Sequence, residues 1–269
     1  MTEKVLVELE GPVGTITLNK PERLNALDVE MWEGIADACR RVDAADDVRV
    51  VILMGAGRCF CAGLDVKAGS TMSSLRADAS PAEALPAIAA HLAHLQSCFT
   101  AVETLRVPVI AAIERACMGA GMELSLCCDI RLAAEGTLFS IPEVRLGLVP
   151  DMGGTQRLPR AVGIGRAKEL IYSARRIDAR EADRIGLVNA VYPAGELHER
   201  AGELALEIAA NAPLAVQAAK RAIDGAYARE RDTGLAWEVQ QAAGPLLSED
   251  RKVGLRAAAE RTRAVFKGT

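Results

Sequence analysis

The chain contains 269 residues, of which 50% are hydrophobic and 25% charged, and this composition is typical of a folded protein with one large domain or a domain with an appendage. The net charge of −4 and the few aromatic residues, four Phe, three Tyr and two Trp, argue against a nucleic-acid partner, which needs basic surfaces and base-stacking rings. The apolar run near the amino terminus is too short for a signal sequence or a membrane span, so we expect a cytoplasmic protein without membrane insertion.

The first 55 residues have the pattern of two strands, a helix and a third strand. Apolar and polar residues alternate at 4–9 and 13–18 around a Gly-Pro pair, which predicts a hairpin. Asp28 is a suitable cap for an amphipathic helix that continues to about residue 42. The nearly continuous apolar run at 48–55 predicts a strand that is buried on both faces.

The middle of the chain repeats this alternation. Residues 70–84 are rich in Ser, Ala and Asp, and they predict a loop that leads into a helix ending near residue 105. The apolar run at 107–114 predicts another buried strand. A glycine-containing turn, a short apolar helix and two strand-like segments, DIRLAA and TLFSI, follow it.

From about residue 195 the pattern is helical. Apolar residues recur at helical spacing in four segments, 196–210, 213–228, 233–246 and 249–266. We expect Pro213 and the pair Gly244-Pro245 to break this tract. The sequence therefore predicts an α/β core at 1–195 and a helical region at 196–269.

The cysteines favour buried thiols over a metal site. They lie at positions 39, 59, 61, 98, 117, 127 and 128. These positions lack the two-residue spacing of zinc-binding pairs, and His91 and His94 have no cysteine beside them. A serine hydrolase is disfavoured too, because none of the three histidines accompanies a nucleophile motif. We therefore expect reduced core cysteines and no bound metal.

Two stretches share one design, in which a buried strand runs into a glycine-containing loop that opens a helix. They are GAGRCFCAGLD after the strand at 48–53 and ERACMGAGMEL after the strand at 107–113. Unpaired amides at a helix start stabilise an oxygen that gains negative charge, so two such loops facing each other would form an oxyanion hole. Taken alone, either loop is better explained by tight turns. The first is not a dinucleotide fingerprint, because Phe60 stands where the third glycine is required.

Four blocks, read in order, resemble the crotonase (enoyl-CoA hydratase/isomerase) superfamily. They are NKPERLNALD at 19–28, RCFCAGLDVK at 58–67, PVIAAIERACMGAGMELSLCCDIRLA at 108–133 and FSIPEVRLGLVPDMGGTQRLPRAVG at 139–163. The likeness covers about residues 4–195, and the helical tail is in keeping with it. The resemblance implies an α/β fold, a right-handed spiral of β-β-α units whose carboxy-terminal helices assemble trimers, usually paired into hexamers.

The resemblance also implies the groups that carry chemistry. It places the oxyanion amides on Leu64 and Ala120, and two catalytic carboxylates on Glu123 and Glu143. Adding water to a 2-enoyl thioester needs one group to activate water toward C3 and another to protonate C2. Each amide would stabilise the enolate oxygen by about 3 kcal/mol. Without the neighbouring loops, Glu123 would be read as a first-turn acid and Glu143 as a surface residue.

Three positions depart from the family pattern. Glu114-Arg115 replaces the usual His-Gly, which puts the shape of that turn in doubt, and Ala120 replaces a common glycine but retains the amide. Asp151 replaces a glycine that is usual in hydratases, and it resembles the aspartate of dienoyl-CoA isomerases. Glu123 instead favours a hydratase, because the isomerases tend to carry Asp there.

The resemblance places coenzyme A, as part of the substrate rather than as a cofactor, along one loop and one turn. The implied contacts are Arg23, Leu24, Ala26, Ala62, Leu64 and Asp65. Arg261, Arg263 and Lys267 give the last predicted helix a basic end that could meet the 3'-phosphate across a subunit boundary, although a solvated helix face is the simpler explanation.

These observations favour a 2-enoyl-CoA hydratase of fatty-acid or related acyl degradation, with an acyl-CoA substrate and a homotrimeric or hexameric assembly. The alternative is a 3,5-dienoyl-CoA to 2,4-dienoyl-CoA isomerase, in which Glu143 and Asp151 move protons at the two ends of the conjugated system. A non-catalytic acyl-CoA-binding protein is the third hypothesis.

Overall fold

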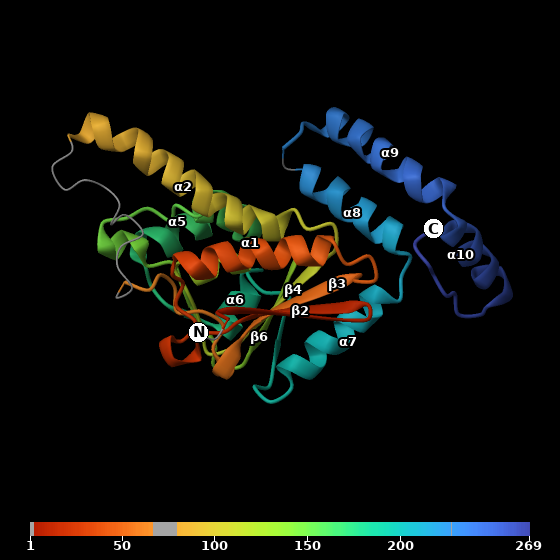
Figure 1. The fold of residues 1–269 in the computed structure, drawn as a ribbon, viewed down its shortest axis with the longest axis horizontal. Helices are drawn as coiled ribbons and strands as arrows, with labels where there is room; N and C mark the ends of the chain where they lie inside the picture. The colour runs from red at the N-terminus through yellow and green to blue at the C-terminus, as the bar shows by residue number, and fades with distance from the viewer. Residues whose placement is uncertain (1–2, 67–79, 227) are drawn as a thin grey trace.

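Two sheets with helices packed around them form the body of the molecule (Figure 1). The computed structural model describes residues 3–66, 80–226 and 228–269. The larger sheet has the spatial order β1 (Val5–Glu10), β2 (Val13–Leu18), β3 (Val50–Gly55), β4 (Val109–Ile113), β6 (Ile130–Ala134) and β9 (Ala190–Tyr192). The smaller sheet has the order β5 (Ala116–Met118), β7 (Leu138–Ser140) and β8 (Ile177–Asp178).

The predicted hairpin and buried strands are confirmed. β1 and β2 pair in antiparallel fashion, with Val5 opposite Leu18, whereas the neighbours from β2 to β9 pair in parallel. β3 and β4 are buried along almost their whole length, as their continuous apolar sequences predict. Because β3 and β4 are parallel neighbours, the loops that follow them emerge side by side at one edge of the sheet.

Helices cover both faces of the larger sheet. Along β3, Val51 and Leu53 point into a cluster with α1 (Val29–Asp43) and α2 (Pro81–Glu103). Val50 and Ile52 point the other way and pack against α7 (Leu197–Ala209). The predicted cap of α1 is present, since the side chain of Asp28 accepts a hydrogen bond from the amide of Met31.

Repeating β-β-α units build the core, so the α/β class predicted from the sequence is confirmed. β1 and β2 are followed by α1, and β4 and β5 are followed by α3 (Ala120–Ser125). β6 and β7 precede η3 (Glu143–Leu146), α4 (Gly154–Val162), α5 (Ile164–Ser173) and α6 (Ala179–Arg184). The predicted loop at 70–84 lies outside the described residues as far as position 79, and its predicted end was too late, because α2 already begins at Pro81 with Ser80 as its cap.

The last three helices extend away from the sheet (Figure 1). They are α8 (Pro213–Ala226), α9 (Arg231–Leu247) and α10 (Glu249–Glu260). Lys220 of α8 anchors them, because its Nζ donates to the carbonyl of Val107 at 3.1 Å and pairs with Asp129 at 2.8 Å. The carboxylate of Asp129 also accepts the amide of Val109 at 2.7 Å. One buried cation therefore joins the helical region to the start of β4, and a domain boundary at residue 195 stays a prediction.

Two predicted helix boundaries were wrong. The helix expected to reach residue 266 ends at Glu260, because Arg261 adopts a left-handed φ of 54° and the chain turns back. The amides of Lys267 and Gly268 then donate to the carboxylate of Asp250 at 2.8 and 2.7 Å. The break expected at Gly244-Pro245 falls instead after Leu247, since a proline near the end of a helix removes only one hydrogen bond.

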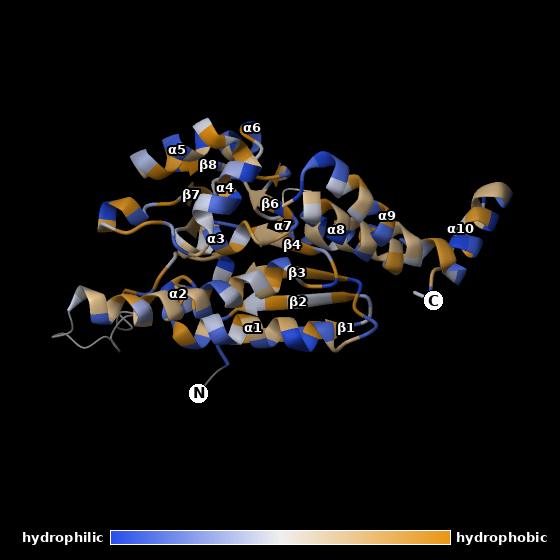
Figure 2. Ribbon diagram, turned by 90° about the horizontal axis from the view of Figure 1, so that it is seen from above, coloured by the Kyte–Doolittle hydropathy of each residue, from blue (hydrophilic) through white to orange (hydrophobic). Residues whose placement is uncertain are grey.

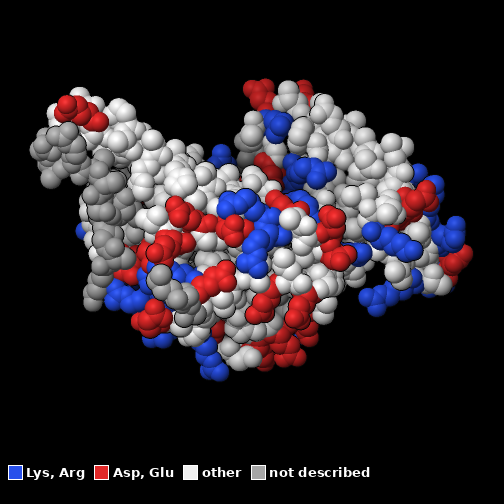
Figure 3. Space-filling view, viewed as in Figure 1, with Lys and Arg blue, Asp and Glu red and all other residues white. Residues whose placement is uncertain are grey.

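The surface mixes both signs of charge. Figure 3 shows acidic and basic side chains interspersed over the face viewed, in keeping with the small net charge. Within the described ranges, no helix has both the length and the apolarity that crossing a bilayer requires.

Candidate active site

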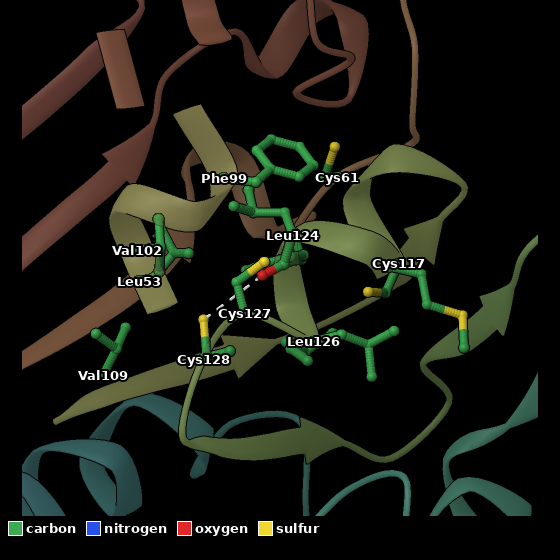
Figure 4. Close-up of a cluster of buried hydrophobic side chains, with 14 of the residues drawn as sticks. Leu53, Cys61, Phe99, Val102, Val109, Cys117, Leu124, Leu126, Cys127 and Cys128 are labelled. Carbon is green, nitrogen blue, oxygen red and sulfur yellow. Dashed lines mark hydrogen bonds between the residues drawn. The ribbon is translucent and has the colours of Figure 1, made fainter. Parts of the chain in front are cut away.

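A short parallel bridge between Cys61 and Cys117 joins the loop that follows β3 to β5, which follows β4. The amide of Cys61 donates to the carbonyl of Ala116, and the amide of Met118 donates to the carbonyl of Cys61, both at 3.0 Å. Both cysteines are fully buried in the apolar cluster of Figure 4. Burial raises the pKa of the Cys61 thiol to about 12, so it stays protonated at neutral pH. The two glycine-containing loops therefore face each other, as the oxyanion-hole hypothesis requires.

Leu64 and Ala120 each lie three residues beyond this bridge. Leu64 pairs with Leu27 through its neighbours, because the carbonyl of Gly63 and the amide of Asp65 bond to Leu27 at 2.7 and 2.8 Å. The amide of Leu64 consequently points away from Leu27. Ala120 begins α3, where an amide has no acceptor within the helix. Neither amide donates to another group in the part of the chain that the structure describes, so both can bind a ligand oxygen.

Glu143 lies beside the amino terminus of α3. Gly119, just before Ala120, has a φ of 51°, and a Cβ atom there would lie 2.7 Å from Oε1 of Glu143, so the site requires glycine. The amide of Gly119 donates to the carbonyl of Ser140 at 2.9 Å, which ties the helix start to the end of β7. Oε2 of Glu143 is buried and has no hydrogen-bond partner among the described residues. An unsatisfied buried carboxyl oxygen of this kind is typical of a functional site.

Glu123 is almost completely buried on α3, with 1% of its surface exposed. Its Oε1 accepts hydrogen bonds from the amides of Met152 and Gly154 at 2.9 and 2.8 Å. Burial and the neighbouring Glu143 carboxyl raise the pKa of Glu123 from 4.5 to about 8, although the two hydrogen bonds oppose this change. Glu123 therefore holds a proton through most of the neutral range.

Asp151 completes a group of three carboxyls. Burial raises the pKa of Glu143 and of Asp151, and the charge of Asp151 further raises the pKa of Glu143 and of Glu123. Gln96 of α2 donates to the backbone carbonyl of Asp151 and so holds this turn. Nearby like charges disfavour simultaneous ionisation, so the charge of Asp151 favours the protonated forms of Glu123 and Glu143. The structure thus brings together the three carboxylates that the sequence singled out.

The structure also brings together the six residues of the loop and turn predicted to contact coenzyme A, Arg23, Leu24, Ala26, Ala62, Leu64 and Asp65. The amide of Ala62 donates to the carbonyl of Leu24 at 3.0 Å. Arg23 and Lys20 each contact a carboxylate oxygen of Asp65 at 2.8 Å. Because Asp65 is buried between two cations, its geometry favours a role in holding the turn against the loop.

Lys267 lies elsewhere. Arg49, which directly precedes β3, donates from Nη2 to the carbonyl of Phe266 at 2.7 Å, so Lys267 lies near the amino end of β3. The loop that contains Leu64 follows the carboxyl end of the same strand. Arg261 and Arg263 belong to the same returning segment and not to a helix. A contact between Lys267 and coenzyme A therefore requires a neighbouring subunit and stays a prediction.

The pair Glu114-Arg115 keeps the turn that a glycine would make. Arg115 has a φ of 64°, in the left-handed region that glycine adopts without strain. The carbonyl of Glu114 accepts the amide of Phe60 at 3.0 Å, and this bond again links the two loops. The side chain of Glu114 is buried, with Oε1 2.9 Å from Nε2 of His198 on α7. The departure from His-Gly therefore attaches the turn to α7 and leaves the backbone path intact.

Two residues that support this site were missed from the sequence. Asn25 is fully buried with a φ of 55°, and its side-chain amide donates to the carbonyls of Ala56 and Cys59 at 2.9 and 2.6 Å. Asparagine is enriched in this conformation, so its place in the turn was an available signal. Lys20 could not have been found in the same way, because its partner Asp65 is 45 residues away.

Comparison with known proteins identifies the family. The model of the enoyl-CoA hydratase/isomerase family matches residues 8–269. The chain is 38% identical over 258 residues to a short-chain-enoyl-CoA hydratase of Clostridium acetobutylicum, covering 96% of this chain and 95% of the relative. It is 35% identical over 265 residues to a crotonyl-CoA hydratase of Syntrophomonas wolfei, covering 98% of both. A crystal structure of an enoyl-CoA hydratase from Bacillus anthracis matches with a TM-score of 0.90 at 38% identity, covering 99% of this chain and 100% of that one. The chain therefore belongs to the enoyl-CoA hydratase/isomerase family. The α/β fold of β-β-α units with carboxy-terminal helices that the resemblance implies is confirmed.

Proposed function

We propose that the protein is an enoyl-CoA hydratase, which adds water across the 2,3 double bond of a 2-enoyl-CoA thioester. One observation carries the proposal: the unpaired amide of Ala120 begins the same helix that carries Glu123, and Glu143 lies against the residue before it. Oxygen-binding amides and proton-transferring carboxyls are thereby placed side by side. Relatives that match nearly the whole chain bear the name hydratase, which supports the same reaction.

The proposed mechanism uses the amides and two of the carboxyls. The amides of Leu64 and Ala120 hold the thioester oxygen. Water attacks C3 while one carboxylate, Glu123 or Glu143, accepts its proton, and the π electrons move onto the thioester oxygen as an enolate. The other carboxyl then donates its proton to C2 and the carbonyl re-forms. Because the raised pKa of Glu123 keeps a proton in the group at neutral pH, a donor and an acceptor are present together.

The test is the hydration of a panel of 2-enoyl-CoA thioesters, followed by the loss of enoyl absorbance and by the mass of the product. Glu123→Gln and Glu143→Gln should each reduce turnover by at least about 100-fold while the protein stays folded. Glu135→Gln is the matched control, because Glu135 is an exposed acid that makes no side-chain hydrogen bond or ion pair with the described residues. Absence of hydration by the parent, or near-normal turnover of either variant, would contradict the proposal.

Asp151 supports a second candidate, the isomerisation of a 3,5-dienoyl-CoA to a 2,4-dienoyl-CoA. The charge of Asp151 raises the pKa of Glu143, so the two carboxyls are near enough to remove a proton at one end of the conjugated system and return one at the other. Dienoyl thioesters in the same panel separate the candidates, because isomerisation adds no water. Isomerisation abolished in Asp151→Asn, without hydration by the parent, would replace the hydratase assignment. A protein that binds both thioester classes without turnover would be a non-catalytic acyl-CoA-binding relative.

We also propose a homotrimer or hexamer that works in the cytoplasm on fatty-acid or related acyl substrates. The carboxy-terminal helices and the segment after them expose large apolar side chains, 56–85% accessible, at Leu235, Val239, Leu247, Leu255 and Val265. Figure 2 shows hydrophobic residues along α9 and α10, beyond the body of the sheet. Apolar surface of this extent is typical of an interface. Light scattering should give a trimeric or hexameric mass, and a monomer would contradict the assembly.

Seven buried, unpaired cysteines favour a reducing compartment, which supports the cytoplasmic location.

A further inference from the structure

The guanidinium of Arg157, on α4, lies directly behind the turn that holds Glu123. Its Nε and Nη2 atoms contact Oε2 of Glu103 at 3.1 and 2.6 Å, and Nη2 also reaches the hydroxyl of Thr100 at 3.3 Å. Glu103 and Thr100 belong to α2, which packs along α1. The third nitrogen, Nη1, donates to the backbone carbonyl of Met152 at 3.0 Å. Arg157 therefore connects a long helix of the core to a single peptide group.

That peptide group lies in the middle of the Glu123 contact. Oε1 of Glu123 accepts the amides of Met152 and Gly154, and the peptide bond between Met152 and Gly153 separates these two donors. Gly153 has a φ of 98°, and a Cβ atom there would lie 1.9 Å from Nη1 of Arg157. The guanidinium thus packs against the turn as well as bonding to it. Rotation of the central peptide would break the Arg157 bond and tilt both amides away from Glu123.

We propose that Arg157 is a positioning residue for Glu123: it holds the turn whose two amides fix Oε1, and so orients the carboxyl for proton transfer. The proposal rests on the hydratase function for its kinetic consequences. It does not require Arg157 to touch the substrate. Its side chain is only 15% exposed and its polar atoms are occupied by Glu103, Thr100 and Met152.

Arginine is required because the side chain donates hydrogen bonds to three groups at once, Glu103, Thr100 and Met152. A planar guanidinium can donate from Nε and Nη2 to one carboxylate oxygen and still donate from Nη1 to a carbonyl on its other side, whereas an ammonium group is a single point. Lysine at this position would keep the charge opposite Glu103 but lose the fixed angle between α2 and the turn. We therefore expect Arg157→Lys to recover only part of the function that Arg157→Met loses.

The expected effect on Glu123 has a definite sign. The two amide bonds favour the ionised carboxyl and lower its pKa, against burial and the charges of Glu143 and Asp151, which raise it. When the turn is released, the lowering contribution weakens and the pKa of Glu123 rises. The titratable groups around Arg157 itself are Glu103, Cys127 and Glu123, and all three favour its charged form. Because the attraction to Glu123 is mutual, loss of the charge in Arg157→Met also raises the pKa of Glu123, so the charge-conserving Arg157→Lys is the variant that reports the turn.

The first test compares Arg157→Met, Arg157→Lys and Arg166→Met as 2-enoyl-CoA hydratases. Arg166 is the matched control, since it makes an ion pair with Glu169 on α5 and has no contact with the turn. Arg157→Met should lower kcat about 10- to 100-fold with KM changed less than about 3-fold, because positioning acts after binding. The limb of the pH profile that reports Glu123 should move to higher pH. An unshifted profile in a folded, impaired variant would overturn the proposal.

A double-mutant cycle makes the test specific. If Arg157 acts through Glu123, then adding Arg157→Met to Glu123→Gln should cost less than about 2-fold in residual turnover. The full 10- to 100-fold loss in that background would show that Arg157 acts by another route. Glu103→Gln, which removes the charge of the anchor and leaves the Met152 contact, should give the same pattern with a smaller loss. It keeps the proposal testable if Arg157→Met does not fold.

A measurement without substrate separates this proposal from the proposed function. Titration of the carboxyl ¹³C signal of Glu123, identified by its absence in Glu123→Gln, should show a higher pKa in Arg157→Lys than in the parent. That shift in a protein without hydratase activity would leave the positioning role standing and remove the hydratase assignment. An identical titration in parent and variant would remove the positioning role whatever the activity.

Discussion

Replacing Ala120 by proline should delete one oxyanion donor while keeping the helix that carries it. Ala120 is the first residue of α3, the helical position that proline tolerates best, because its amide has no acceptor inside the helix. Gly119 precedes it with ψ of −125°, outside the helical region that a following proline disfavours. The backbone can therefore keep its conformation, and the substitution removes the amide hydrogen of residue 120.

The size of the loss follows from the number of donors. Two amides, those of Leu64 and Ala120, face the proposed enolate oxygen, and removal of one donor from such a pair costs about 3–4 kcal/mol in the transition state. Turnover of Ala120→Pro should accordingly fall about 100- to 1,000-fold. Ala120→Gly retains the amide and should stay within about 5-fold of the parent, so it is the matched control.

The assay is hydration of one 2-enoyl-CoA thioester, together with the urea midpoint of each variant. A second readout is the absorption band of an aryl-conjugated enoyl-CoA bound to the protein, which shifts to longer wavelength when the thioester oxygen is polarised. Ala120→Pro should bind this ligand with a reduced shift. A folded Ala120→Pro with turnover within about 3-fold of the parent would refute the assignment of the oxyanion hole to this amide.

Three further changes test other parts of the site. The raised pKa of Glu123 contributes stability that is complete below about pH 4.5 and lost as pH rises toward 8. Between pH 5 and pH 9 the unfolding free energy of the parent should therefore fall by about 2–4 kcal/mol more than that of Glu123→Gln, and parallel urea titrations would contradict this. Arg115→Gly should raise the unfolding free energy by about 0.5–1 kcal/mol by relieving a left-handed backbone, and an unchanged or lowered urea midpoint would show that the arginine side chain compensates for the strain. Asp151→Asn should reduce hydration less than about 10-fold, and a loss as large as that of Glu143→Gln would assign Asp151 to the reaction.

The sequence predicted the elements whose signals are local. The hairpin, the Asp28 cap and the buried strands at the centre of the sheet each depend on neighbouring residues, and the structure has them. The end of the last helix was missed because it depends on a distant contact, the carboxylate of Asp250 that receives the amides of Lys267 and Gly268. Periodicity cannot report a chain reversal that is stabilised from another turn of the same helix.

The residues of the site also differ in whether local sequence could predict them. Leu64, Ala120, Glu123 and Glu143 could be named because they stand in sequence blocks with a known order. The supporting residues Lys20 and Arg157 could not, since their partners Asp65 and Glu103 are 45 and 54 residues away and any surface cation would look alike in the sequence. Ion pairs formed by the tertiary fold therefore cannot be predicted from the sequence, even where the proposed reacting groups can.

Because Cys61 and Cys117 are joined by a parallel bridge, the number of residues after each cysteine decides where the amides of the proposed oxyanion hole lie. Both proposed donors are backbone atoms, so their positions depend on the path of the backbone more than on the side chains of Leu64 and Ala120. Each donor lies three residues past the bridge. Deleting or inserting one residue between the bridge and either donor would displace that amide relative to the other. A redesign of this pocket must therefore keep the residue count of each loop, and it must also keep Gly63, Gly119 and Gly121, where a Cβ atom would lie less than 3.0 Å from another atom.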